Sequence, residues 1–396
     1  MHMNFSEDVE HSYFFSQPHQ PFFILAFVNA LATMVIFMLS FKGVINMDIT
    51  AIDYHAYGFI YLLFTPAFFG FLLTTFPRFA STPVIEKDAY MRVFTFYYIG
   101  SALVILGSLA TPVFTGFGML ITFIGHLWGF LILNNIYIKT TMEDTHDLMW
   151  ITISMGIGVI AHGLLIVGTL LHIGMTGFAT EIAIYLYLFM LAFSVAQRMV
   201  PFFSHCMVDK NTYLLKSLFI LLSLHILVEG FIVNGSFIID LIIGALLLKE
   251  VIRWKLPFPN PNPLLWILHI ALYWAGLAFV LGGVTNLITL WLGTSFLALD
   301  IHTLMLGFVF TILIGFGTRV TLGHSGNMMH ADHYTTFLFY WTQVVVLARL
   351  LTSLTTSFGW DFMVLFDMTA TVWIVMFLAW AARFFTVLIK GTKLVN

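Results

Sequence analysis

Two histidines stand in apolar runs of the sequence, where an ionisable side chain is costly and usually functional. His55 begins one run, and His302 lies about 6 residues inside another, hence roughly 9 Å below one membrane face. Both runs are expected to start at the same face, so the two imidazoles share a depth. A six-coordinate haem takes axial nitrogens from opposite faces of the macrocycle. The pair therefore predicts a b-type haem held between two helices.

Four further ionisable residues fall near the middle of apolar runs. His126 and His162 belong to successive runs, and the hairpin between them can bring the two side chains together. Glu229 follows His225 by four residues, which places both on one helix face. Imidazole and carboxylate ligands suit copper and iron, so these residues are candidates for a copper site or a second haem. The alternative for each histidine is a hydrogen bond to a backbone carbonyl or a neighbouring helix.

Arg349 also lies inside an apolar run, about 14 residues from its start and roughly 10 Å below the outer face. An unpaired guanidinium at that depth costs at least about 2.5 to 3.5 kcal/mol, so it requires an anionic partner. We expect a haem propionate in that role, with Asp300 nearby tuning the charge. The alternative is a simple ion pair with Asp300 or Asp367.

The elements that carry these side chains must be membrane-spanning helices. Of the 396 residues, 60% are hydrophobic and only 9% are charged, too few to cover a soluble globule. The net charge of -3 is too small to indicate nucleic-acid binding. The single cysteine, Cys206, excludes an intrachain disulfide, a thiolate iron–sulfur cluster and a cysteine zinc site. The composition thus predicts an all-α integral membrane protein in which any metal uses histidine, methionine, carboxylate or a porphyrin.

Twelve apolar runs predict a polytopic membrane protein with one transmembrane domain over residues 1–396. The runs are Pro21–Phe41, His55–Phe76, Val93–Ala110, Val113–Ile138, Leu148–His172, Ile182–Phe203, Leu215–Ile232, Gly235–Val251, Leu264–Trp291, Ser295–Thr318, Thr335–Ser357 and Asp361–Leu388. Residues 1–20 are polar and lack a basic region before a short apolar core. We therefore expect a short N-terminal segment without a cleaved signal peptide.

The distribution of basic residues predicts the orientation. Of the 16 Lys and Arg, all except Lys42 and Arg349 fall on the side that holds both termini. Positive residues accumulate in cytoplasmic loops, so both termini are expected to be cytoplasmic.

Four segments carry a resemblance to a known family. They are HAYGFIYLLFTPAFFGFLLTTFP from His55, AQRMVPFF from Ala196, LHIALYWAGLAFVLGG from Leu268 and IHTLMLGFVFTILIGFGTRVTLGHSG from Ile301. Together they resemble the NnrS family. The resemblance implies a twelve-helix protein of the bacterial inner membrane that carries haem and copper. It also implies an association with denitrification and with tolerance of nitric oxide.

The same resemblance nominates individual residues. The matched ligand candidates are His55, His269, His302 and His324, and the matched basic residues are Arg198 and Arg319. One departure stands out. The family commonly has a second His and a Glu just after the first His of the second span, where this chain has Tyr57 and Gly58.

A more distant likeness concerns the haem-copper oxidases, which also have twelve core spans and cytoplasmic termini. They hold a low-spin haem between a His of span two and the second His of a His-x-His in span ten. Here His55 and His302 match those ligands, while Asp300 replaces the His that would hold the catalytic haem. Spans six and seven also lack the copper ligands. We therefore do not expect an oxygen or nitric oxide reductase of that mechanism.

Three functions from different classes remain open. The first is a haem protein of nitric oxide defence that binds NO or carries out one-electron chemistry. The second is an electron-transfer or quinol-linked subunit of a respiratory complex. The third is a transporter of a small ion that uses Glu229 and His225 as buried proton or ion sites.

Overall fold

The computed structural model describes residues 13–394, which are helical with no strand among them. The helices are η1 (Tyr13–Phe15), α1 (His19–Phe41), α2 (Ala51–Tyr57), η2 (Gly58–Phe64), α3 (Thr65–Phe79), α4 (Lys87–Ala110), α5 (Pro112–Lys139), α6 (His146–Leu170), α7 (Thr176–Glu181), η3 (Ile182–Phe189), α8 (Met190–Phe203), α9 (Leu214–Phe231), α10 (Phe237–Arg253), α11 (Pro263–Leu292), α12 (Leu299–His302), η4 (Thr303–Phe310), α13 (Thr311–His324), α14 (His333–Ser353), α15 (Thr355–Phe358) and α16 (Phe362–Lys390). The η2, η3 and η4 segments are π-helices.

Eleven of the described helices are long and apolar enough to cross a membrane. Three of them are composite spans in which a π-helix continues an α-helix: Ala51–Phe79, Thr176–Phe203 and Leu299–His324. The predicted eighth span corresponds to α10, which has 17 residues, among them four charged ones. The all-helical membrane fold is therefore confirmed, and the count of twelve spans stays a prediction.

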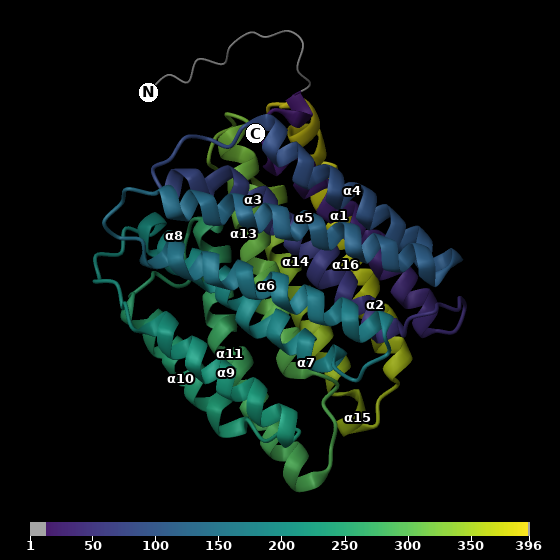
Figure 1. Ribbon diagram of the computed structural model, residues 1–396. Helices are drawn as coiled ribbons and strands as arrows, with labels where there is room; N and C mark the ends of the chain where they lie inside the picture. The colour runs from purple at the N-terminus through teal and green to yellow at the C-terminus, as the bar shows by residue number, and fades with distance from the viewer. Residues whose placement is uncertain (1–12, 395–396) are drawn as a thin grey trace.

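The two ends of the described chain lie at the same end of the helical bundle. A Cβ added to Gly391 would lie 2.9 Å from the ring of Tyr13, so the start of the described chain packs beside the end of α16 (Figure 1). Ends on one side require an even number of crossings. This arrangement favours α10 as a twelfth span, while the cytoplasmic location of the termini remains a prediction.

Local sequence sets several of the helix ends. Helices α5 and α11 begin with proline, which is favoured in the first turn because its missing N–H has no intrahelical partner there. The preceding Thr111 and Asn262 accept hydrogen bonds from the backbone N–H groups of Val113 and Leu264. The helices therefore start where the sequence supplies a cap.

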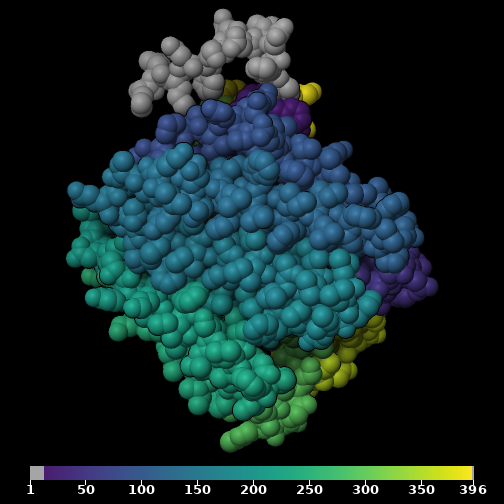
Figure 2. All heavy atoms as spheres, in the orientation of Figure 1, coloured from purple at the N-terminus to yellow at the C-terminus, as the bar shows by residue number. Residues whose placement is uncertain are grey.

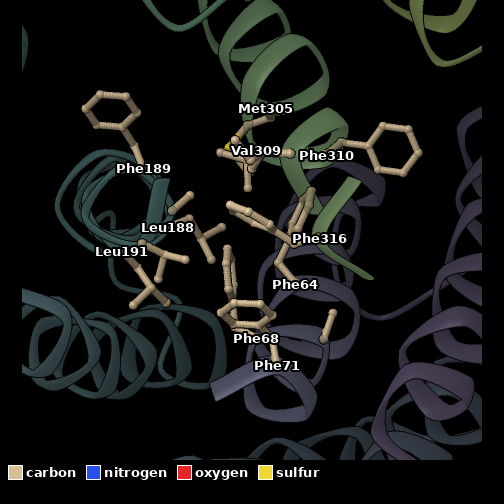
Figure 3. Close-up of a cluster of buried hydrophobic side chains, with 14 of the residues drawn as sticks. Phe64, Phe68, Phe71, Leu188, Phe189, Leu191, Met305, Val309, Phe310 and Phe316 are labelled. Atoms are coloured by element: carbon tan, nitrogen blue, oxygen red, sulfur yellow. The ribbon is translucent and has the colours of Figure 1, made fainter. Parts of the chain in front are cut away.

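The three composite spans form the centre of the molecule. In their most apolar stretches 94%, 72% and 67% of the residues are buried, against 56% or less in the other candidate spans. Figure 3 shows where they meet: Phe64, Phe68 and Phe71 lie beside Leu188, Phe189 and Leu191 and beside Met305, Val309, Phe310 and Phe316. Each composite span contains one of the π-helices, which often mark functional sites. The candidate haem ligands stand at the ends of two of these spans.

The helices around this centre expose apolar side chains. Figure 2 shows one such face, where blue and teal helices between α4 and α6 form the surface. The exposed residues of α4, α5 and α6 include Leu106, Phe117, Leu131 and Ile160. A surface of this kind suits contact with lipid chains, as the composition predicts.

Candidate functional site

The structure brings His55 and His302 together, as the sequence predicts. His55 lies in α2 and His302 ends α12, each just before the π-helix of its span. Their ring centres are 6.1 Å apart, with an angle of 29° between the ring planes. Two imidazoles bound to opposite sides of one metal, with bonds of about 2.0 Å, have ring centres about 6 Å apart. The pair therefore fits axial ligation of a haem iron.

Hydrogen bonds orient the His302 imidazole. Its Nδ1 donates to the carbonyl oxygen of Ala298 at 2.8 Å, and its Nε2 has no hydrogen bond within residues 13–394. A metal-ligating histidine usually donates its second ring N–H to a carbonyl or carboxylate in this manner. His55 is less constrained, since its buried Nδ1 has no partner among the described residues. Phe37 and Phe59 flank the His55 ring at centre distances of 4.3 and 4.7 Å.

The guanidinium of Arg349 borders the same site. It donates to the hydroxyl of Ser353, to the carbonyl of Leu297 at 3.0 Å, and faces His302 Nδ1 at 3.1 Å. Because His302 Nδ1 already donates to a carbonyl, it cannot also accept from the guanidinium. None of the hydrogen bonds that Arg349 makes to described residues reaches a carboxylate. Arg349 is thus a cation without an anionic partner in this part of the chain.

The alternative of a simple ion pair for Arg349 is wrong. Asp367 pairs instead with Lys42, whose Nζ lies 2.6 Å from the carboxylate. Asp300 lines a cavity with Tyr185 and His225 and makes no ion pair with Arg349 among the described residues. The two side chains have different neighbours. Arg349 contacts the Leu297 carbonyl and the His302 ring, whereas Asp300 faces α11.

The second predicted pair, His126 and His162, is also in contact. Both side chains are fully buried, and their Nδ1 atoms are 3.2 Å apart. His162 Nε2 lies 3.0 Å from the hydroxyl of Tyr57, which in turn lies 2.6 Å from the hydroxyl of Thr122. Tyr61 stacks on His162 with ring centres 3.8 Å apart. The position where the chain departs from the family pattern is therefore part of this cluster.

The donor and acceptor of each hydrogen bond in this cluster can be assigned one after another, starting from Thr122. Thr122 donates to the carbonyls of Gly118 and Met119, so Tyr57 donates to Thr122. His162 Nε2–H then donates to the Tyr57 oxygen, and His126 Nδ1–H donates to His162 Nδ1. His126 Nε2 is left buried without a partner in the described chain. The cluster is a hydrogen-bonded chain that ends in one free imidazole nitrogen.

His225 and Glu229, expected on one helix face, line the same cavity but make no hydrogen bond to each other among the described residues. His225 Nδ1 donates instead to Asp240 of α10 at 2.6 Å, and both side chains are only 3% exposed. Glu229 accepts backbone N–H groups of Asn234 and Ser236 in the turn between α9 and α10. A spacing of four residues places two side chains on one helix face. Their hydrogen-bond partners, however, depend on the neighbouring helix, which here is α10.

A polar cavity of about 220 Å³ adjoins this histidine. Its walls include Glu181, His225, Glu229 and Asp300, together with Asn286. Behind His225, Asp240 also accepts hydrogen bonds from Ser236 and Asn286. The sequence analysis missed Glu181 and Asp240. Each is an ionisable residue within or beside an apolar run, as Asp300 is, and could have been identified in the same way.

The remaining family-matched residues lie elsewhere. His269 uses both ring nitrogens in hydrogen bonds, to Ser204 at 2.8 Å and to the carbonyl of Pro257 at 3.0 Å. His324 bonds Gln17, and Arg319 lies 4.1 Å from the centre of the Phe203 ring. Arg198 forms an ion pair with Asp147 and lies over Phe79. These four residues are not part of the His55–His302 site.

Among residues 13–394, no group of three or more His, Cys, Asp or Glu side chains that could hold a metal ion is found. The arrangement at His55 and His302 instead suits a metal that brings its own equatorial ligands. A porphyrin does so, and needs only two axial nitrogens from the protein.

Comparison with known families agrees with the resemblance noted in the sequence. A family model described as NnrS protein matches residues 13–391. No curated protein matches the chain. The match covers nearly the whole sequence, and the chain therefore belongs to the NnrS family.

Proposed function

Because this chain is an NnrS-family membrane protein, we propose that it acts in the response to nitric oxide through a haem held by His55 and His302. The observation that carries the proposal is the 6.1 Å separation of the two imidazoles at the ends of two central spans. When bound, the haem would supply one-electron redox chemistry. The bacterial inner membrane is the proposed location, and NO or another small nitrogen species is the proposed substrate.

The surrounding residues have defined parts in this proposal. The Ala298 carbonyl keeps the proton on His302 Nδ1 and so directs Nε2 to the metal. Arg349, which lacks a carboxylate partner in the described chain, would hold a propionate. With His55 and His302 both holding it, the haem would support electron transfer rather than direct binding of a gas. A quinol or a protein redox partner would then supply the electron.

The test is a reduced-minus-oxidised spectrum of the purified protein with metal analysis. We expect a low-spin b-type spectrum that is lost in both His55→Ala and His302→Ala. His172→Ala is the matched control, because this exposed histidine follows α6 and lies outside the site. A spectrum unchanged in both site variants, or a purified protein without haem, would refute the proposal.

Copper is the second cofactor proposed for this chain. The buried histidine pair and its neighbours offer one free nitrogen, on His126, and a Tyr57 hydroxyl in place of a third imidazole. Metal content that is unchanged in His126→Ala and His162→Ala would assign the pair to hydrogen bonding alone.

Transport of a small ion is the second candidate function, and the polar cavity favours it. His225, oriented by Asp240, faces this cavity together with the carboxylates of Glu181 and Asp300. Ion uptake by proteoliposomes that is abolished in His225→Gln, while haem is absent from the pure protein, would favour transport over redox chemistry.

A further inference from the structure

A third pair of neighbouring imidazoles lies at the far end of the span Leu299–His324, which carries His302 near its start. His19 is the first residue of α1, and His324 is the last residue of α13. Their ring centres are 5.0 Å apart, with an angle of 53° between the planes. At 1.5 Å per residue, the 22 residues from His302 to His324 correspond to about 33 Å, so this pair is separate from the proposed haem site.

The His19 side chain is buried without a hydrogen bond. It is 1% exposed, and its Nδ1 has no partner among the described residues. Its backbone N–H donates to the hydroxyl of Thr74 at 3.1 Å. A buried polar group without a partner is destabilising, and such a group in a native structure often indicates a missing ligand.

The His324 ring is held in a defined orientation. Its Nδ1 lies 2.5 Å from the side-chain oxygen of Gln17, which only accepts, so Nδ1 carries the proton. In the neutral imidazole the lone pair is then on Nε2. This is the arrangement of a metal-ligating histidine, whose second nitrogen donates to a nearby oxygen.

From these contacts we infer that His19 and His324 bind a transition-metal ion. The set contains two imidazoles and no thiolate, which suits the Cu²⁺ or Zn²⁺ class of ion. A haem is excluded by distance, because axial imidazoles on opposite sides of one metal have ring centres about 6 Å apart. The shorter separation and the tilted planes fit two nitrogens on one side of a single ion, with the other positions open to water.

The experiment uses the full-length protein in detergent, stripped of metal with a chelator and then titrated with Cu²⁺. Bound copper is measured after dialysis, and electron paramagnetic resonance reports the number of coordinating nitrogens. We expect His19→Gln and His324→Gln each to lose one equivalent of copper with a two-nitrogen signal. Gln17→Leu keeps both imidazoles and should weaken copper binding by about 10- to 100-fold, as loss of an orienting partner does.

His330→Gln is the matched control, because His330 is exposed in the loop that follows α13 at the same end of the bundle. Copper binding that persists at wild-type level in His19→Gln would overturn the proposal, as would an equal loss in His330→Gln. Gln17→Leu tests binding without removing either imidazole. If this variant folds and binds copper with unchanged affinity, the assignment is also contradicted. The haem spectrum of the same samples should remain unchanged, so the two proposals can fail independently.

Discussion

Replacing Tyr57 by Phe should destabilise the protein through one identifiable hydrogen bond. The Tyr57 hydroxyl is buried and accepts from His162 Nε2 at 3.0 Å, while its contact with Thr122 is 2.6 Å. Without the hydroxyl, His162 Nε2 has no partner. Thr122 is not left unpaired, because it still donates to two backbone carbonyls. The expected cost is therefore that of one unsatisfied buried polar group, about 1 to 3 kcal/mol.

Tyr61→Phe provides the matched control for this prediction. Tyr61 is equally buried and stacks on the same histidine, but its hydroxyl has no partner among the described residues. Phe keeps the ring and removes the unpaired hydroxyl, so we expect no loss of stability or a slight gain. The free energy of unfolding is measured for each variant in mixed micelles by a denaturant titration. Equal effects of the two substitutions would refute the assigned hydrogen-bond chain.

Three further outcomes are expected. Tyr57→His places a third imidazole beside the two buried histidines, and should add one equivalent of bound Zn²⁺ measured by metal analysis. Arg349→Leu should lower haem content, whereas Asp300→Asn should not, since Asp300 is not among the bonding partners of Arg349 in residues 13–394; equal pigment loss in both would contradict this. Burial raises the pKa of Asp332, but hydrogen bonds at the start of α14 and the Arg383 guanidinium outweigh it and hold the pKa below its usual value. A lowered pKa in the folded state stabilises above the unfolded value of about 3.9, and this stabilisation is lost as the pH falls through the folded value. Asp332→Ala should thus cost about 1 to 2 kcal/mol at pH 7, mainly as a lost helix cap, and less near pH 3 in unfolding titrations at both pH values.

The presence of the spanning helices could be predicted from the sequence, because each corresponds to an apolar run about long enough to cross a bilayer. The predicted first span begins at Pro21, while α1 begins at His19. This small difference mattered, because it left His19 in the segment expected to be polar and to precede the first span. A histidine next to a helix start gives no indication in sequence of whether it is buried, and here the packing of α1 against α3 and α13 buries it.

The pairing of side chains was less predictable than their depth. Matched depth brought His55 to His302 correctly, because both stand near the start of spans that run in the same direction. Depth alone did not identify Asp240 as the partner of His225, since that contact depends on how α9 packs against α10. The periodicity of a helix shows on which face a residue lies. The bonding partner comes from the opposing helix, which the sequence does not identify.

The three π-helices explain how the central spans serve two purposes. They occur in the second, sixth and ninth of the eleven candidate spans, and each follows ionisable side chains at the same end of the bundle. His302 precedes η4 directly, Glu181 precedes η3 directly, and His55 lies three residues before η2. A π-helix inserts an extra residue per turn, which rotates the residues before it relative to those after it. The apolar residues below can therefore pack into the core shown in Figure 3, while the polar residues above turn toward the proposed haem site and the cavity. The His55–His302 pair and the polar cavity thus lie at one end of the three central spans, above turns that pack into the core.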